Sequence, residues 1–303
     1  MIRLWLGIMV LAGSLLPLWG QAADEMHSEA ESSGPLQVSY FQRTIKNELS
    51  DYERYWVGLL EMALQKSGRS YELNAVVGDE ISHGRINRSL EAGGPVSVAY
   101  MGTSTAVEAT LMPIRIPVFR GLLGYRIMMT NDQSDELFQQ VNSIVDLKKA
   151  NYGLGLHWAD VPIMKDAGLT VTELNYKHLF QVLASHRVHA VSRAAHEITG
   201  EFSILSKSFP NLRINQDIVL AYRQASYFFV GPHNKVLADT IEMGLENAYA
   251  DGSFMTYFNG HPAVQSALKL LNGKQRKTIW IENHHLSPET RSLPDRYWFS
   301  PAP

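Results

Sequence analysis

Hydrophobic and polar positions along residues 36–101 follow a repeating order of strands and helices. Residues 36–41 (Leu-Gln-Val-Ser-Tyr-Phe) alternate between apolar and polar, as in a strand with one buried face. Residues 55–66 carry apolar side chains at helical spacing, and Gly68 just beyond them favours a helix end. The same reasoning predicts a strand at 71–77, a short helix at 82–90 and a buried strand at 96–101. This order is typical of a parallel sheet covered by helices.

The order restarts near residue 121 and predicts a second α/β unit that extends to about residue 225. Its expected strands are 122–129, 151–156, 169–174 and 188–192, and its expected helices are 135–145, 161–167 and 176–185. After this unit we expect a strand at 225–230, helices at 235–250 and 252–260, and a strand at 278–281. The chain is therefore predicted to be an α/β protein of two units.

Between the two units, the run from Arg115 to Arg126 (Arg-Ile-Pro-Val-Phe-Arg-Gly-Leu-Leu-Gly-Tyr-Arg) places three arginines in an apolar, strand-like stretch. Arginine is costly in such surroundings unless an anionic or planar polar group meets it. Proline and glycine indicate that the strand bends or leaves a sheet. We interpret the run as a crossing between lobes with a ligand-facing edge. Strand alternation allows only one of Arg115 and Arg120 to face a ligand unless Pro117 shifts the register, and the alternative is a pair with a carboxylate across the lobes.

The first residues favour export. Residues 1–22 have a basic start, an apolar run and small residues at a cleavage position, as in a signal peptide. Residues 23–35 are acidic and serine-rich and are expected to be a disordered leader. The chain has no cysteine, which excludes disulfides and a lipoprotein anchor. We therefore expect a periplasmic protein, and the net charge of -3 gives no argument for nucleic acid.

Several segments, in the right order over some 200 residues, resemble those of a known family. Ser143-Ile-Val-Asp-Leu-Lys148 is similar to its S-x-x-D-L-K step, and Ala248-Tyr-Ala-Asp-Gly-Ser-Phe254 to its L-x-x-D-G-T helix end. The segment Tyr176–Ser192, with Leu183, Arg187 and Val188, is similar to its Y-x6-L-x-x-G-R-V-D-A-V pattern. The chain thus resembles the type II periplasmic solute-binding proteins, in particular the amino-acid-binding-like family (extracellular solute-binding protein family 3-like).

The resemblance implies a two-lobed fold in which 121–225 form a second lobe inserted into a first lobe of 36–120 and 226–303. It also implies ligand binding between the lobes for an inner-membrane ABC permease, in a monomer that is not an enzyme and has no cofactor. A separate membrane sensor as partner is the alternative use of the same module. A cleft enzyme is a third reading, for which Glu108 and Glu197 are the available acids.

Two departures from the family pattern bear on the ligand. Where amino-acid binders have an S-G-T-T turn whose amides hold a carboxylate, this chain has Leu156-His-Trp-Ala159. Where they have an aspartate for the ammonium group, it has Arg193. The usual amino-acid clamp is therefore not intact, which favours an anionic or aromatic ligand.

Nine residues are candidates for ligand contact. Arginine forks and aromatic faces suit planar anionic or aromatic groups, and strand ends are where open α/β sheets present their ligands. The candidates are Tyr40, Arg43, Tyr100, Thr103, Arg115, Arg120, His157, Trp158 and Arg193.

Each candidate has a structural alternative. Tyr40 and Arg43 also suit a surface loop, and Thr103 also suits a helix cap. His157 and Trp158 also suit packing at a turn, and Arg193 also suits a salt bridge with Glu197 one helical turn on. The histidines have no spacing typical of a metal site, so we expect no metal.

Overall fold

The computed structural model describes residues 34–45, 48–78, 81–273 and 276–299. The expected signal peptide and most of the expected leader lie outside these ranges. The following description concerns the chain from Pro35 onward. In these described ranges no helix has the length and apolarity to cross a bilayer.

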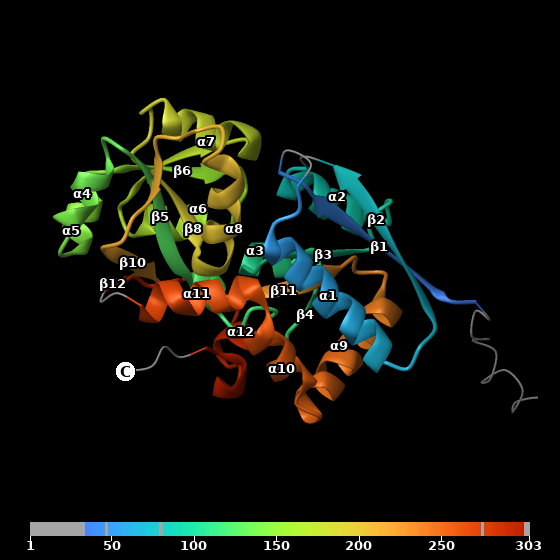
Figure 1. Ribbon diagram of the computed structural model, residues 1–303. Helices are drawn as coiled ribbons and strands as arrows, with labels where there is room; N and C mark the ends of the chain where they lie inside the picture. Colours follow the sequence, from blue (N-terminus) through green and yellow to red (C-terminus); the bar gives the residue numbers. More distant parts are fainter. Residues whose placement is uncertain (1–33, 46–47, 79–80, 274–275, 300–303) are drawn as a thin grey trace, which may run out of the picture. The chain divides into compact units, whose positions relative to one another are not determined.

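The first lobe is built on a five-stranded sheet (Figure 1). Its strands follow the order β2-β1-β3-β11-β4, in which β1 pairs in parallel with β2 and β3, and β11 runs antiparallel to β3 and β4. The strands are β1 (Leu36–Arg43), β2 (Tyr71–Gly78), β3 (Val98–Gly102), β4 (Met112–Ile114) and β11 (Ser226–Val230). The predicted parallel arrangement therefore holds for β1, β2 and β3.

Two long helices pack against each other in this lobe, α1 (Asp51–Lys66) and α9 (Lys235–Ala250). Helix α1 buries Tyr55, Leu59 and Ala63 along one face, as its apolar spacing predicts. A Cβ atom on Gly244 would lie 1.7 Å from the Ala63 carbonyl oxygen, so only glycine permits this close approach. The other helices of the lobe are α2 (His83–Glu91), α3 (Thr105–Glu108) and α10 (Ser253–Gly260).

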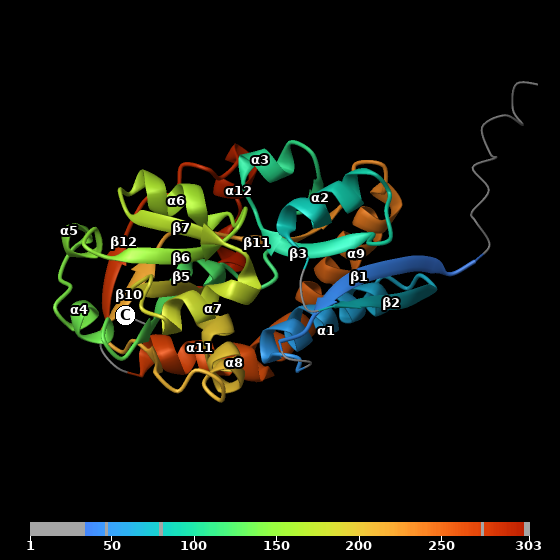
Figure 2. The ribbon, with the colours of Figure 1, turned by 90° about the horizontal axis from the view of Figure 1, so that it is seen from above.

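The second lobe is built on a seven-stranded sheet (Figure 2). Its order is β12-β10-β5-β8-β6-β7, and β9 pairs with β5 beside this path. The strands are β5 (Tyr125–Asn131), β6 (Asn151–Gly155), β7 (Thr170–Leu174), β8 (Ala190–Ala194), β9 (Leu212–Ile214), β10 (Ile218–Ala221) and β12 (Lys277–Trp280). Its helices are α4 (Asp135–Gln139), α5 (Ile144–Leu147), α6 (Asp160–Asp166), α7 (Tyr176–Ala184), α8 (Ala195–Leu205) and α11 (Pro262–Asn272).

Strand β12 lies far along the chain from the rest of its sheet. It falls within 226–303, the range expected in the first lobe, yet it pairs in parallel with β10 of the second sheet. The chain beyond β12 forms α12 (Pro288–Arg291) and a 3₁₀ turn, η2 (Asp295–Tyr297). A segment late in the chain thus adds a strand to the second sheet, and α12 and η2 follow that strand.

The run 115–126 is not a strand over most of its length, which corrects the strand prediction. Residues 115–121 form a bend and turns, the 3₁₀ helix η1 (Leu122–Gly124) follows, and only then does β5 begin. Arg120 and Gly121 have φ values of +51° and +82°, which no strand adopts. Strand alternation therefore does not decide which arginine faces a ligand.

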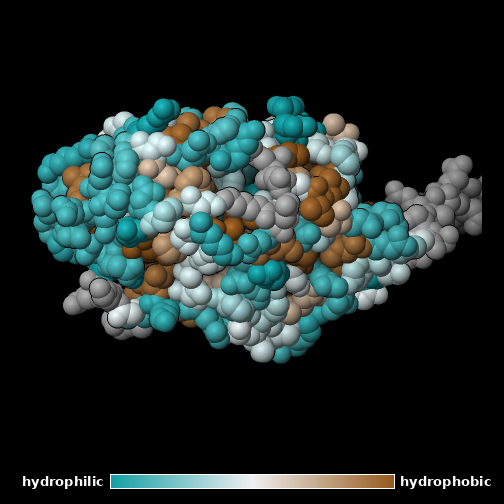
Figure 3. Space-filling view, turned by 45° about the horizontal axis from the view of Figure 1, so that its top comes forward, coloured by the Kyte–Doolittle hydropathy of each residue, from teal (hydrophilic) through white to brown (hydrophobic). Residues whose placement is uncertain are grey.

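Residues 115–124, called the first crossing below, lead from β4 of the first sheet to β5 of the second. Residues 222–225, the second crossing, return from β10 to β11. The two crossings touch, because a Cβ atom on Gly124 would lie 1.9 Å from the Tyr222 carbonyl oxygen. The face shown in Figure 3 is hydrophilic over much of the second lobe, and hydrophobic residues gather nearer the first lobe.

Candidate functional site

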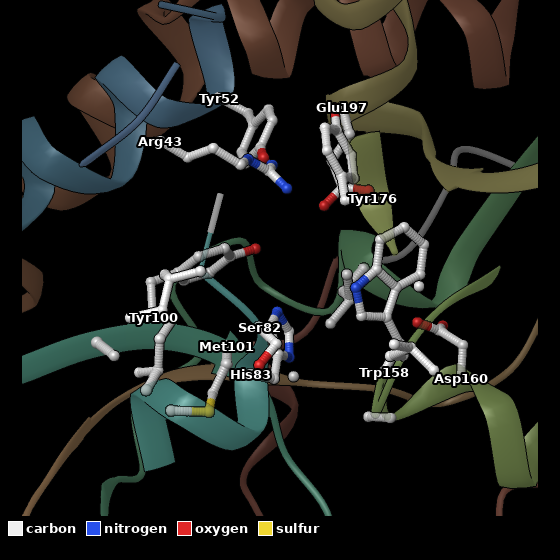
Figure 4. A pocket seen from close by; sticks show the side chains of 18 of the residues that line it. Arg43, Tyr52, Ser82, His83, Tyr100, Met101, Trp158, Asp160, Tyr176 and Glu197 are labelled. Carbon is white, nitrogen blue, oxygen red and sulfur yellow. The ribbon is translucent and has the colours of Figure 1, made fainter. Parts of the chain in front are cut away.

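A cavity of about 120 Å³ lies between the lobes and is lined by both of them. The first lobe contributes side chains from the end of β1, from α1, from the start of α2 and from β3. The second lobe contributes the turn after β6, the start of α7, and the junction of β8 with α8. Figure 4 shows Arg43, Tyr52 and Tyr100 of the first lobe and Trp158, Tyr176 and Glu197 of the second around this space.

The second-lobe wall is organised around Arg193, the fourth residue of β8. Its Nε and Nη2 atoms donate to the two carboxylate oxygens of Glu201, both at 2.6 Å, and Nη2 lies 3.0 Å from Glu197. Glu201 has no exposed surface and also accepts a 2.9 Å hydrogen bond from the Tyr176 hydroxyl. The guanidinium lies 4.6 Å from the centre of the Trp158 ring. This wall is a closed network whose parts hold one another in place.

Arg126 and Asp160 also line the cavity and form a second buried cluster. Arg126 is 1 % exposed, donates to the Leu123 carbonyl and to both oxygens of Ser192, and lies 3.4 Å from Asp160. The Tyr222 hydroxyl donates to the same Asp160 carboxylate. Arg126 therefore has a partner on each of its three nitrogens and holds the second lobe to the crossing.

The first-lobe wall is organised around Arg43, the last residue of β1. Its Nε lies 3.4 Å from Glu53, and its Nη2 lies 3.9 Å from Glu201 of the other lobe. The guanidinium lies 4.3 Å from the centre of the Tyr176 ring and 5.3 Å from that of Tyr52. Arg43 therefore reaches across the cavity and contacts both lobes.

The polar atoms of this wall are incompletely paired. The buried Nε of Arg43 and the buried hydroxyl of Tyr52 have no hydrogen-bond partner. An unpaired buried donor costs about 1–3 kcal/mol, so such groups in a cavity mark a place where a ligand gains by accepting hydrogen bonds.

The two walls shift the pKa values of their glutamates in opposite directions. Burial raises the pKa of Glu53 to about 7, although Arg43 and the 2.8 Å hydrogen bond from Trp56 Nε1 partly oppose this. Burial would also raise the pKa of Glu197, but the charge of Arg193 and the backbone N–H of Ala194 outweigh it and hold the pKa well below its usual range. Glu197 is therefore charged at neutral pH, whereas Glu53 titrates there.

Histidine adds no charge on the first-lobe side. Burial and the neighbouring Arg43 lower the pKa of His83 to about 4, so its imidazole is neutral at neutral pH. Three arginines, Arg43, Arg126 and Arg193, thus lie in or beside the cavity. They are balanced by three carboxylates, those of Glu197, Glu201 and Asp160. The charge of Glu53 changes with pH near neutrality.

Four of the nine predicted residues line the cavity, namely Arg43, Tyr100, Trp158 and Arg193. The hydroxyl of Tyr100 lies 3.4 Å from Nε2 of His196 on α8, so it also bridges the lobes. Arg193 forms the ion pair with Glu197 that was its structural alternative, and Glu201 adds a second. Their role in binding stays a prediction.

The other five predicted residues lie outside the cavity lining. Arg115 pairs with Glu108 at 2.7 Å, and Thr103 donates to the same carboxylate. Arg120 donates to the carbonyls of two residues near the C-terminal end, 296 and 298. Tyr40 packs edge-on against Trp56.

His157 is the fifth of these residues, and it occupies the turn after β6. Its φ of +63° turns the side chain away from the strand. A Cβ atom on Gly84 of α2 would lie 3.5 Å from its ring, so His157 approaches the first lobe beside the cavity.

Sequence reasoning missed Tyr52, Glu53, Tyr176 and Glu201 as residues of this site. Tyr52 and Glu53 begin α1, where acidic and polar residues usually face solvent. Helix α8 was not predicted at all, because its buried face carries His196, Glu197 and Glu201 beside its apolar residues. Helix spacing gave no signal for the pair of Arg193 and Glu201, because Arg193 lies in β8 and Glu201 lies on the following helix.

Comparison with known proteins gives likeness in structure alone. No protein-family model and no curated protein sequence matches the chain. An ancestral arginine-binding protein bound to arginine is 18 % identical, with a TM-score of 0.53 over 76 % of this chain and 98 % of that one. A Salmonella typhimurium periplasmic binding protein with high arginine specificity is 14 % identical, with a TM-score of 0.56 over 75 % and 99 %.

A third likeness is to a ligand-binding core. The GluR0 ligand-binding core from Nostoc punctiforme, in complex with glutamate, is 14 % identical, with a TM-score of 0.52 over 76 % of this chain and 100 % of that one. At these identities the likeness shows the fold and nothing finer. The predicted fold is confirmed: the chain has the two-lobed α/β fold shared by the amino-acid-binding substrate-binding proteins of ABC transporters.

Proposed function

We propose that this chain is a periplasmic solute-binding protein that holds a small dipolar ligand between its lobes. One observation carries the proposal: Arg43 enters the interlobe cavity with a buried Nε that makes no hydrogen bond, although Glu53 lies 3.4 Å away, and the hydroxyl of Tyr52 nearby makes none either. These groups suit a carboxylate or another group rich in acceptor oxygens. The fold supports the binding role by analogy only.

The ligand is proposed to carry a donor or positive group as well. Glu197 is charged and lines the opposite wall, and its contacts with Ala194 and Arg193 both use Oε2, not Oε1. The arginines predicted to attract an anion are balanced by carboxylates, since Arg126 lies beside Asp160 and Arg193 beside Glu197 and Glu201. A ligand with both kinds of charge matches such a cavity better than a simple anion.

Cavity size limits the ligand. The volume of about 120 Å³ is below the roughly 300–1,000 Å³ of pockets that hold drug-sized molecules. The rings of Trp158 and Tyr176 carry guanidinium groups at 4.6 and 4.3 Å, so their contribution is to position Arg193 and Arg43. A compact ligand of amino-acid size is therefore proposed, with aromatic stacking as a minor contribution.

Delivery to an ABC permease is the proposed purpose, with no catalysis. The expected export signal and the fold of ABC-transporter binding proteins support it. Ligand sensing for a separate membrane receptor is the second candidate, and the likeness to the GluR0 ligand-binding core favours it. The genes beside this one distinguish the two, because a permease or a sensor should be encoded there.

Thermal unfolding with matched compounds tests the binding proposal. The panel takes each α-amino acid together with its decarboxylated amine and its deaminated 2-oxo acid, at 1 mM. A dipolar ligand at about 100 times its Kd stabilises by roughly 2.7 kcal/mol, a rise in Tm of about 5–10 °C for a protein of this size. The two singly charged relatives should give a clearly smaller rise.

Arg43→Ala is the matched variant for any compound that binds, and Arg213→Ala is its control. The Arg213 side chain donates through Nη1 to the carbonyls of residues 210 and 212, and it lies outside the cavity lining. Arg43→Ala should lose the Tm rise and Arg213→Ala should keep it. Equal rises for the amino acid and its 2-oxo acid would refute the dipolar ligand, and no rise with any compound would count against the binding role.

A further inference from the structure

Residues 281–299, called the C-terminal strap below, contact both crossings between the lobes. The strap begins where β12 ends, with Ile281 N–H donating to the Ala221 carbonyl at 2.9 Å. It ends beside the first crossing, where the Phe299 N–H donates to the Arg120 carbonyl at 2.6 Å. These bonds fix one end of the strap to the last residue of β10, just before the second crossing, and the other end to the first crossing.

Trp298 of the strap lies between the two crossings. A Cβ atom on Gly121 of the first crossing would lie 2.6 Å from the indole, so the ring packs directly on that backbone. On the second crossing, the guanidinium of Arg223 lies 4.2 Å from the centre of the same ring. One indole therefore links the two segments.

Hydrogen bonds to the backbone strengthen the link at each crossing. Arg120 donates through Nη2 to the carbonyls of Arg296 and Trp298, each at 3.0 Å. On the other side, Nδ2 of Asn283 donates to the Arg223 carbonyl at 3.0 Å and to Oε1 of Gln224 at 2.7 Å. The strap thus bonds to the main chain of both crossings.

The middle of the strap is tied to each lobe. Thr290 contacts the first lobe, where its hydroxyl lies 3.0 Å from Glu108 and from the Tyr227 hydroxyl. His285 contacts the second lobe, where its Nε2 lies 2.8 Å from Asp166 of α6, while its carbonyl accepts from Thr105 of the first lobe. A relative rotation of the lobes has to break or rearrange these contacts.

We propose that the C-terminal strap braces the two crossings and holds the lobes in the arrangement seen here. Lobe movement in a two-domain protein is absorbed by dihedral changes in a few connecting residues. The strap bonds to residues of both crossings and to each lobe in this arrangement. It therefore favours the closed arrangement, in which the lobes meet across the cavity, over an open one. The size of this preference is the free energy of the strap contacts that are lost when the lobes separate.

Distance measurements between the lobes test this proposal without a ligand. Because the chain has no cysteine, spin labels can be placed at Gln65→Cys on α1 and Lys177→Cys on α7, which are both exposed. Double electron–electron resonance then gives the interlobe distance distribution of the full chain. Trp298→Ala should add a population at longer distance, and Trp280→Ala, at a 60 % exposed tryptophan outside the strap, is the control.

Arg223→Ala provides a second variant that should not disturb folding, because Arg223 is exposed. It removes only the cation–π contact, worth about 0.5–1 kcal/mol, and should raise the ratio of long to short distances about two- to fivefold. A folded Trp298→Ala protein with unchanged or shorter distances overturns the proposal. If Trp298→Ala does not fold, the same criterion applied to Arg223→Ala decides. The readout contains no ligand, so it stands whether or not the proposed function fails.

Discussion

The two walls of the cavity are built in opposite ways. The second-lobe wall is a network in which Nε and Nη2 of Arg193 are bonded to Glu201, and Nη2 also lies beside Glu197. The first-lobe wall contains Arg43, whose nearest carboxylate oxygens lie 3.4 and 3.9 Å away and whose Nε is unpaired. Both arginines are largely buried, but only Arg193 donates close hydrogen bonds to a carboxylate of its own protein.

This difference assigns a positioning role to the second-lobe wall and a ligand-binding role to the first-lobe wall. A buried carboxylate bonded to a guanidinium and a phenol fixes the side chains around it, and the second-lobe wall is therefore ready before a ligand arrives. The first-lobe wall has donors without acceptors and a glutamate whose pKa is raised to about 7. It can gain hydrogen bonds to its donors on binding, whereas the other wall offers a ligand Oε1 of Glu197 and otherwise holds bonds that are already made.

Removing the centre of the closed wall should have the largest effect. Glu201→Ala leaves Arg193 buried with one carboxylate fewer, and breaking a buried pair in this way costs about 3–5 kcal/mol. Urea unfolding at pH 7 measures the loss. Glu173→Ala, which breaks the exposed pair with Lys165, is the control and should cost less than about 1 kcal/mol. Equal losses for the two variants would contradict a structural network in the second-lobe wall.

The second-largest expected effect is the contribution of Glu53 to the pH dependence of the free energy of unfolding. Its folded pKa of about 7 lies above the usual 4.5, so its contribution is complete below pH 4.5 and is lost as the pH rises through 7. The free energy of unfolding should therefore fall by about 3 kcal/mol more in the wild type than in Glu53→Gln between pH 4.5 and 8. Urea unfolding at several pH values checks this. Glu61→Gln, at an exposed position of the same helix, should keep the wild-type slope.

Arg43→Ala should have the smallest effect on stability, because its contacts are long and its Nε is unpaired. We expect a change below about 1 kcal/mol, within the range of ordinary substitutions. Its effect on binding should be larger than its effect on folding, about 10–100-fold in Kd for a lost charge-assisted hydrogen bond. Isothermal titration calorimetry with the compound found in the panel measures this. A large loss of stability with unchanged Kd would reverse the roles given to the two walls.

Periodicity was sufficient for the fold because most elements bury one regular apolar face. Helix α9 begins and ends at the predicted residues, Lys235 and Ala250. The predicted strand 122–129 begins three residues late, and the strand-like run before it is not a strand, for a physical reason: Val118, Phe119 and Leu122 are fully buried, but in turns and a 3₁₀ helix. Apolar residues in succession show burial and do not show the backbone conformation that achieves it.

The candidate site was predictable only where a residue follows a strand or turn in the local sequence. Arg43, Trp158 and Arg193 were found in that way, and Tyr100 was found at its strand end. The partners that decide their roles come from elsewhere in the chain: Glu53 and Glu201 both approach Arg43, and they are 148 positions apart in number. Local sequence patterns can identify an arginine as a candidate site residue. Which carboxylates balance its charge depends on segments that are distant in sequence and are brought together by folding.

The tryptophans of the cavity give the protein an optical signal of its own. Trp56 and Trp158 line the cavity, and Trp56 is stacked on Tyr100 with ring centres 5.9 Å apart. Displacement of a neighbouring guanidinium or phenol by an incoming molecule changes the surroundings of these indoles, and with them the emission intensity and wavelength. Trp280 and Trp298 lie outside the cavity lining, so direct contact with a bound molecule is expected at Trp56 and Trp158. Binding can therefore be followed on the unlabelled protein by intrinsic fluorescence in a stopped-flow instrument.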